Sequence, residues 1–338
     1  MNLTISLSKF FKMKRIVGIG NALVDVMTLI DSDFILEKFS LPRGSMQLVD
    51  AEKSALIKKE TANFKRNLAS GGSAANTIHG LAMLGLESGF IGSIGKDDTG
   101  DFFENDMKIA GVKTFLIRRN SVTGTAVALI SDDSERTFAT HLGAAVELSA
   151  EDLNSGDFKN YDILYLEGYL IFNKPLVERA CAIARENNMK IAIDLASYNV
   201  VEAKLQDLKE IVEKYADIVF ANEDEAKAFT GLPPFEALNI LSANCDIAVI
   251  KVGSEGSLIK RGDEIVKIGT IPVDCIDTTG AGDLYASGFL YGYANELSLD
   301  KCGMFGSILA GHVIEIVGAR MDSVRWKKII KSLREEIL

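Results

Sequence analysis

Cysteine and histidine are scarce in this sequence, and neither is grouped in a way that predicts a metal centre or a disulfide framework. Among 338 residues there are four cysteines and three histidines: Cys181, Cys245, Cys275, Cys302, His79, His141 and His312. No Cys-x-x-Cys pair occurs, and no histidine stands at metal-ligand spacing from a cysteine. We therefore expect reduced thiols, and histidines without a catalytic role.

Long apolar runs and dense basic stretches are also missing. No window reaches the roughly 18 to 20 uninterrupted apolar residues that a membrane-spanning helix needs. The start, Met1–Lys14, is interrupted by lysines and is not followed by a small-residue cleavage site. With 37 basic and 47 acidic residues the net charge is −10, and no basic stripe suits a nucleic acid. These absences predict a cytoplasmic protein with neither a membrane nor a nucleic-acid partner.

The main body alternates buried β-branched runs with helical patterns. The composition, 47% hydrophobic and 25% charged, is that of an ordinary globular protein. We expect strands at 15–19, 89–94, 162–166, 190–195, 216–220 and 245–252, and helices at 73–84, 175–187 and 223–229. Alternation of this kind favours parallel strands joined by right-handed crossovers. The predicted fold is a three-layer α/β/α sandwich with a central, mostly parallel sheet.

Two stretches interrupt this alternation. Residues 26–49 and 113–142 read as short strands joined by turns, and we expect them to form a small β-sheet that closes as a lid over the carboxyl ends of the core strands. The predicted α/β catalytic core then comprises 15–25, 50–112 and 143–338. Residues 1–14 are a candidate flexible extension, and both Met1 and Met13 are candidate starts.

The strongest chemical signal is Asp-Thr-Thr-Gly-Ala-Gly-Asp at 277–283, followed by an apolar helical run. Gly280, Ala281 and Gly282 expose their backbone N–H groups at a helix start, where the helix dipole favours an anion such as phosphate. Asp283 lies in the same first turn and could accept a proton from an attacking hydroxyl. An acid beside an anion site indicates phosphoryl transfer, although the same residues also suit a simple helix cap and turn.

A second glycine-rich element, Ala-Ser-Gly-Gly-Ser-Ala-Ala-Asn at 69–76, again precedes a helix. Gly71 and Gly72 would allow a ligand to approach the backbone. Asn76, one turn into the helix, could reach a hydroxyl. By itself this element fits a plain loop-to-helix turn equally well.

Together, 71–76 with Leu84-Gly85, and 277–283 with Gly288, closely resemble the two signature segments of the PfkB (ribokinase-like) carbohydrate and nucleoside kinases. The resemblance extends from about Arg15 to about Gly318. It implies an ATP-dependent kinase in which Asp283 is the general base and Gly280, Ala281 and Gly282 form the anion hole. It also implies an enzyme that acts on a small-molecule nucleoside or sugar. The exposed edge strands of the predicted lid could pair with a second subunit or serve a monomer, so a monomer and a homodimer both fit.

The resemblance further assigns cofactor residues. Asn222-Glu225 matches a segment that orders Mg²⁺ and the phosphates, with Glu225 reaching the ion through water. Lys251, Gly253 and Gly256 match the strand-to-loop segment beside ATP. Asp277 and Thr279 stand where some members of the family hold a monovalent cation, for which K⁺ is the candidate.

The acceptor is expected between the first strand and the lid. By resemblance the acceptor residues are Asn21, Asp25, Gly71, Gly72 and Asn76. Arg136 is a lid residue that could reach the acceptor or a phosphate, and a solvent-facing hairpin charge fits it equally well. A carboxylate such as Asp25 can accept from two adjacent hydroxyls, as in a ribose.

Segments 20–25, 31–34 and 39–41 look more like adenosine kinases than ribokinases. Met46, Leu48, Tyr169 and Phe172 are candidates for an apolar slot that holds a base.

Three alternatives compete with a nucleoside kinase. A ribokinase- or fructokinase-type sugar kinase fits the same motifs. A non-catalytic sensor of nucleotides or sugars would share the fold, although the retained Asp283 argues against it. A dehydrogenase fails because Gly18-x-Gly20 lacks the third glycine of a dinucleotide-binding turn, and Asp25 comes too early for a ribose contact.

Overall fold

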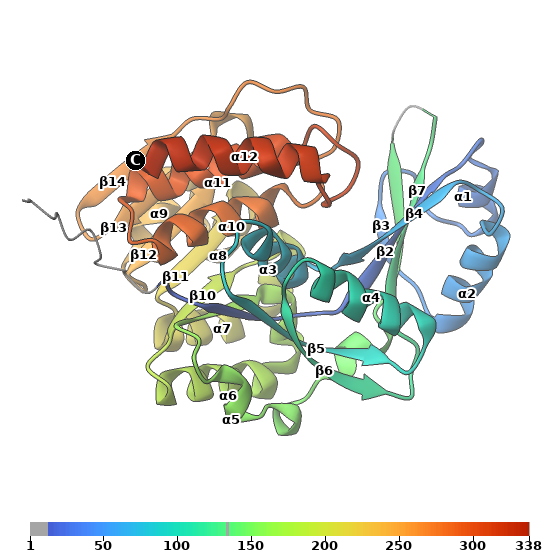
Figure 1. Ribbon diagram of the computed structural model, residues 1–338, viewed down its shortest axis with the longest axis horizontal. Coiled ribbons are helices and arrows are strands. Elements are labelled where there is room, and N and C mark those ends of the chain that lie inside the picture. The colour runs from blue at the N-terminus through green and yellow to red at the C-terminus, as the bar shows by residue number, and fades with distance from the viewer. Residues whose placement is uncertain (1–12, 133–134, 338) are drawn as a thin grey trace, which may run out of the picture.

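The computed structural model describes residues 13–132 and 135–337, which form a large α/β body and a smaller β-sheet at one end (Figure 1). Within these residues, nine strands make the large sheet in the order β14-β13-β12-β11-β10-β9-β1-β5-β6. Their bounds are β1 (Ile16–Ile19), β5 (Ser88–Gly95), β6 (Lys113–Arg119), β9 (Ile163–Glu167), β10 (Lys190–Asp194), β11 (Ile218–Asn222), β12 (Ile247–Lys251), β13 (Ser257–Arg261) and β14 (Glu264–Ile268). All neighbours from β12 to β6 are parallel, whereas β13 and β14 add antiparallel pairs at the other edge.

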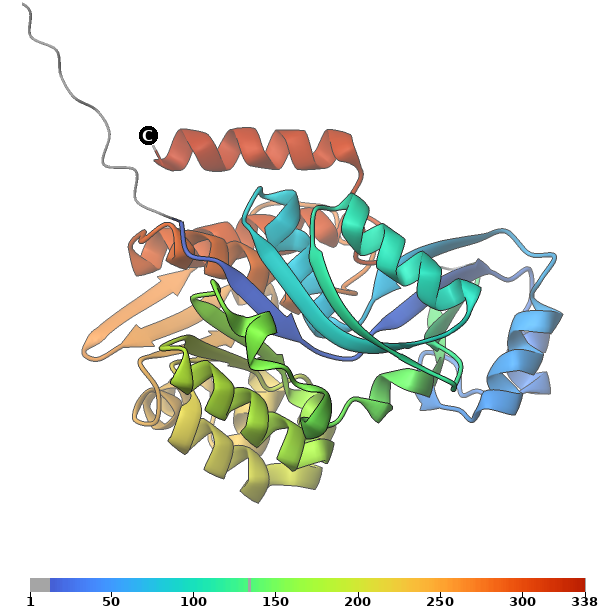
Figure 2. The same ribbon diagram turned by 60° about the horizontal axis from the view of Figure 1, so that its bottom comes forward.

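Helices cover both faces of the large sheet, which confirms the predicted three-layer fold. One face carries α3 (Ser73–Met83), α4 (Asp98–Ile109), α10 (Ala281–Ala294) and α11 (Leu299–Val313), with α12 (Ser323–Ile337) outermost against α11 (Figure 2). The opposite face carries α6 (Lys174–Glu186), α7 (Tyr198–Tyr215), α8 (Glu223–Thr230) and α9 (Pro234–Ser242), and α5 (Ser155–Phe158) packs beside α6. The central strands are buried on both sides, which explains their continuous apolar runs.

The small sheet has the order β3-β8-β7-β2-β4, with bounds β2 (Leu23–Leu29), β3 (Met46–Leu48), β4 (Arg66–Gly71), β7 (Gly124–Ile130) and β8 (Arg136–His141). Helices α1 (Phe34–Lys38) and α2 (Ala51–Glu60) belong to the same end of the molecule (Figure 1). Asp25 and Met27 share a face of β2, and with Arg136 of β8 they border the space next to the large body. The sheet is therefore placed to act as a lid.

The structure differs from the predicted boundaries of the lid at two whole strands, and also at residues 23–25, which begin β2, and at α2, both of which were predicted as core. Lys113–Arg119 pairs in parallel with β5 and belongs to the large sheet, because α4 makes β5-α4-β6 a crossover unit. Arg66–Gly71, predicted as part of the core, pairs antiparallel with β2 as the edge of the lid. This strand was not predicted because its sequence is mostly polar, and an edge strand does not need an alternating apolar face.

Residues 1–12, most of the predicted N-terminal extension, lie outside the described residues. Lys14, predicted as part of the same extension, pairs with Glu296 at 3.4 Å and lies over the ring of Tyr293. In the described residues, no helix combines the length and the apolar character required to cross a membrane.

Candidate active site

The predicted site residues gather where the carboxyl ends of the parallel strands meet the lid. Asn21 follows β1, Glu167 and Asp194 end β9 and β10, and Lys251 ends β12. Strands that run parallel in register place these residues along one edge of the sheet. The first turns of α3 and α10 reach the same edge, and their side chains interact directly there.

Asp283 lies in the first turn of α10 and is held by two donors from α3. Ser73 Oγ donates to Oδ1 at 2.8 Å, and Asn76 Nδ2 donates to Oδ2 at 2.9 Å. Burial raises the pKa of Asp283 to about 6, the two hydrogen bonds oppose this shift, and nearby Asp194 adds to it. A carboxylate with such a pKa is largely ionised at neutral pH yet basic enough to take a proton.

The glycines of both motifs permit close approaches that a side chain would block. Gly72 has φ of 98°, and a Cβ there would lie 2.0 Å from the carbonyl oxygen of Asn21. A Cβ on Gly71 would lie 2.4 Å from the carboxylate of Asp25. Gly280, with φ of 77°, is the N-cap of α10. Among the predicted acceptor residues, Gly72 therefore lies against Asn21 and Gly71 lies against Asp25.

The carboxyl groups of Asp25 and Asp283 lie in the electrostatic field of the Arg320 guanidinium, which also pairs with Asp106 at 4.0 Å. Burial raises the pKa of Asp25 to about 6, Arg320 lowers it, and Asp283 raises it. Arg320 donates through Nη1 to Asn76 Oδ1 at 2.9 Å and through Nη2 to Ser70 Oγ at 2.9 Å. Arg320 thus orients the side-chain amide of Asn76 through its oxygen, and the amide nitrogen donates to Asp283.

Sequence reasoning missed Arg320 and also Glu167. Glu167 Oε1 accepts from the backbone and side-chain nitrogens of Asn21, at 2.9 and 2.6 Å, and Oε2 accepts from Ala74 N at 2.8 Å. Burial raises the pKa of Glu167 to about 7 against these donors. Glu167 therefore fixes the loop after β1 against the start of α3. An acid at the end of an apolar strand was the available sequence signal.

Arg136 crosses from the lid to the start of the α10 motif. Its guanidinium pairs with Asp277 Oδ1 and lies 3.4 Å from Thr279 Oγ1. Asp277 also accepts from Thr279 N at 2.9 Å and from Gly318 N at 2.5 Å. The predicted cation ligands Asp277 and Thr279 are thus together, but a guanidinium already neutralises Asp277. This arrangement does not fit an additional K⁺.

A cavity of about 440 Å³ opens beside the first turn of α10. It is lined by both apolar and backbone surfaces, including Lys251, Gly253, Gly256, Ala281 and Gly282. Its residues Ile271, Val273 and Tyr285 supply apolar area for a flat ring. The predicted nucleotide residues Lys251, Gly253 and Gly256 therefore share one cavity with the first turn of α10.

Asn222 and Glu225 lie at the start of α8 and bond mainly to each other. Asn222 N and Nδ2 donate to the two oxygens of Glu225 at 2.8 and 2.7 Å, and Asn222 Oδ1 accepts from Glu225 N. In residues 13–132 and 135–337, no group of three or more His, Cys, Asp or Glu is arranged to hold a metal. Each Glu225 oxygen keeps a lone pair, which fits a contact to an ion through water.

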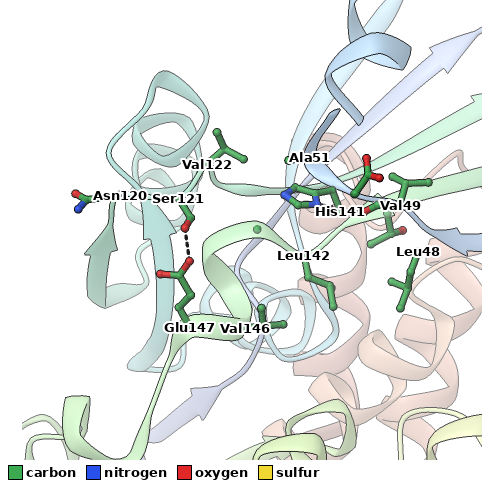
Figure 3. A pocket seen from close by; sticks show the side chains of 13 residues that line it. Leu48, Val49, Ala51, Asn120, Ser121, Val122, His141, Leu142, Val146 and Glu147 are labelled. Carbon is green, nitrogen blue, oxygen red and sulfur yellow. Dashed lines mark hydrogen bonds between the residues drawn. The ribbon is translucent and has the colours of Figure 1, made fainter. Parts of the chain in front are cut away.

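A second cavity, of about 580 Å³, lies between the lid and the large body (Figure 3). Leu48, Val122, Leu142 and Val146 give it apolar walls, and Ser121 and Glu147 are hydrogen-bonded at its rim. Of the four residues predicted for an apolar slot, Leu48 lines this cavity, whereas Met46, Tyr169 and Phe172 do not. Phe172 is exposed beneath the ammonium of Lys204 instead.

Comparison with known proteins decides the family. The model of the pfkB family of carbohydrate kinases matches residues 45–326. The chain belongs to the pfkB family. It is therefore a kinase that transfers a phosphoryl group to an alcohol, and its family implies ATP as the donor.

Individual pfkB relatives match over nearly their whole length. A probable sugar kinase from Rhizobium etli is 32% identical, with a TM-score of 0.85, over 95% of this chain and 98% of that one. The adenosine kinase of Sinorhizobium meliloti is 33% identical, with a TM-score of 0.84, over 96% and 99%. A nucleoside kinase of Methanocaldococcus jannaschii is 27% identical over 96% of this chain and 98% of that protein. The two solved structures share the fold, and the three relatives carry names for different acceptors.

Proposed function

We propose that the chain is an ATP-dependent nucleoside kinase that phosphorylates a primary hydroxyl, with Asp283 as general base. The observation that carries the proposal is the position of Asp283 between the residues of the 440 Å³ cavity and the predicted acceptor residues. The nucleotide cavity adjoins its first helical turn, and the acceptor residues Asn76 and Asp25 lie on its other side. When bound, ATP would supply the phosphoryl group and an anionic leaving group.

The chain's own residues provide the rest of the chemistry. Asp283 takes the proton of the attacking hydroxyl, since its pKa of about 6 leaves it mainly ionised at neutral pH. The backbone N–H groups of Gly280 and Gly282 stabilise negative charge at the helix start, whereas Ala281 N, also predicted for the anion hole, donates to Thr278 O at 3.1 Å. Glu225 and Asn222 are the residues that would hold Mg²⁺ through water, and the ion would there supply positive charge to the phosphates. A requirement for K⁺ would demand that Arg136 leave Asp277, and rates in K⁺ and in tetramethylammonium buffers would reveal it.

For the acceptor, Asp25 accepts hydrogen bonds from neighbouring ribose hydroxyls, aided by Asn21 and Asn76. Gly71 and Gly72 leave room for the sugar against the backbone, and Arg136 caps the site from the lid. Asp25 pairs with Ala126 on β7, Ala126 pairs with Thr140 on β8, and Thr140 lines the second cavity. A base attached to that sugar would therefore extend toward Leu48 and Leu142.

A free-sugar kinase is the second candidate, because relatives named as sugar kinases match equally well. The apolar cavity favours a nucleoside, since a free sugar offers no flat apolar group to fill it. A cytoplasmic location and a monomeric or dimeric state accompany the proposal as expectations.

The test is Mg-ATP-dependent ADP release with adenosine, inosine, guanosine, cytidine, ribose and fructose. We expect turnover on nucleosides that Asp283→Asn lowers by at least ~10³-fold while nucleotide binding persists. Leu48→Asp should raise KM for the nucleoside about tenfold or more. Leu68→Asp is the matched control. Leu68 is a comparably exposed leucine on β4, and it pairs with Val26, the residue that follows Asp25 and therefore faces the other side of the small sheet. Turnover confined to ribose or fructose would replace the nucleoside by a sugar, and no turnover would favour a sensor.

A further inference from the structure

Lys251 is a buried ammonium whose partners leave part of its hydrogen-bonding capacity unused. It ends β12, its side chain is 14% exposed, and Nζ donates to Asp194 Oδ2 at 2.9 Å. An ammonium has three N–H donors. In the described part of the chain, Asp194 provides the only hydrogen bond made by Nζ. Two donors therefore remain for a ligand.

The ammonium lies directly against the anion-hole backbone. A Cβ added to Gly282 would lie 3.1 Å from Lys251 Nζ, so Nζ is within contact distance of the first turn of α10. Lys251 and Gly282 line the same 440 Å³ cavity, and Asp283 follows Gly282 in sequence. The charge therefore stands where the nucleotide cavity meets the proposed general base.

The surroundings keep Lys251 protonated. Burial works to lower its pKa, but the carboxylates of Asp194 and Glu225 outweigh burial and raise the pKa above its ordinary value. Asp283 adds to the same effect. A fixed cation in such a poorly hydrated place interacts strongly with an anion that arrives beside it.

We propose that Lys251 is a further catalytic residue of this kinase. Its ammonium is held in place by Asp194, and it binds oxygens of the phosphoryl group while that group is transferred beside Gly282. This inference rests on the proposed function. Lys251 stays protonated throughout and stabilises the developing negative charge. Asp283 receives the proton of the acceptor hydroxyl as the new O–P bond forms and the bond to the ADP leaving group breaks. Glycine at 282 is then required so that the cation and the backbone N–H groups reach the same anion.

A purely structural role for Lys251 would be to neutralise Asp194 and Glu225. The two roles separate in a double variant, because Lys251→Met with Asp194→Asn removes one positive and one negative charge together. The amide that replaces the Asp194 carboxylate keeps an oxygen that can accept from Ala196 N, a bond of 2.9 Å in the native protein. Asp194→Asn alone and Lys251→Met alone complete the cycle.

Four quantities are measured on the four proteins: the unfolding temperature without ligand, the calorimetric Kd of Mg-ADP, the Kd of Mg-ADP with aluminium fluoride and adenosine, and kcat. In the double variant we expect native-like unfolding and a Kd for Mg-ADP within about threefold of the wild-type value. Its kcat should remain about 10²- to 10³-fold lower, and aluminium fluoride should no longer tighten binding.

Recovery of kcat to within about threefold in the double variant, with aluminium fluoride still tightening binding, would overturn the inference and leave Lys251 a charge-neutralising residue. Failure of the proposed function is distinguishable, since the wild-type protein would then turn over none of the nucleosides or sugars tested. That result would remove the inference together with the function on which it rests.

Discussion

The hydrogen bond from Ser73 to Asp283 should set the pH at which the enzyme loses activity in acid. Ser73→Ala removes the donor that lies 2.8 Å from Oδ1 and leaves the rest of α3 unchanged. A hydrogen bond to a charged group contributes about 1.5–3 kcal/mol when fully buried, and about 1 kcal/mol is reasonable for this partly exposed carboxylate. At about 1.36 kcal/mol per pKa unit, the pKa should rise from about 6 to about 6.7.

The sign follows from the role of a general base, which works only when unprotonated. Activity in the wild-type protein should fall about tenfold between pH 7 and pH 5, as Asp283 gains its proton. In Ser73→Ala the loss relative to wild type should be about fourfold at pH 5.5 and vanish by pH 8. The assay is kcat/KM for ADP release from pH 5 to 8.5.

Ser242→Ala, which deletes a hydroxyl at the end of α9, is the control and should leave the profile unchanged. An acid limb that does not move in Ser73→Ala, or a loss that is equal at every pH, would refute Asp283 as the titrating base.

Three further substitutions test the site. Arg320→Met should lower the free energy of unfolding by about 3 kcal/mol in urea titrations, because buried acids lose their cation, and should raise KM for the acceptor as Asn76 loses its orienting donor. The stability advantage of Asp283→Asn over the wild type should grow by about 1 kcal/mol as the pH rises from 5 to 7.5. The native carboxyl has a pKa above its unfolded value, so its ionisation destabilises the folded wild-type protein over that range. Gly72→Ala should weaken acceptor binding more than about tenfold in calorimetry, because its Cβ would collide with Asn21, whereas Gly85→Ala, also at positive φ but with open space around it, tests backbone strain alone.

The sequence predicted what depends on local patterns. Glycine-rich helix starts consist of consecutive residues, so 69–76 and 277–283 could be recognised directly in the sequence. The buried strands could be recognised by their continuous apolar runs. The geometry then brought Ser73 and Asn76 onto Asp283 across more than 200 residues. No local pattern specifies that contact, although the two motifs implied that their ends would share a site.

The residues that sequence reasoning missed act through long-range packing. Arg320 reaches Asn76 over 244 residues, and it follows the last motif in an irregular segment without a helical or strand pattern. The boundaries of the lid were misplaced for a related reason, since whether a strand such as 66–71 joins one sheet or the other depends on its partner. Met46 and Phe172 have the apolar character expected of a base slot, but the cavity is lined by other side chains.

The contact of Arg136 with Asp277 links the lid to the start of the α10 motif. Among the described residues, Nε and Nη2 of this buried guanidinium have no hydrogen-bond partner, so this contact between the lid and the large body leaves donors unsatisfied. Phosphoryl oxygens beside Arg136 would accept hydrogen bonds from these donors. The arrangement in which the lid contacts the large body would then become the more stable one. Under the proposed function, the site would then close rarely when water occupies the place of the acceptor. ATP would therefore be protected from hydrolysis while no acceptor is bound.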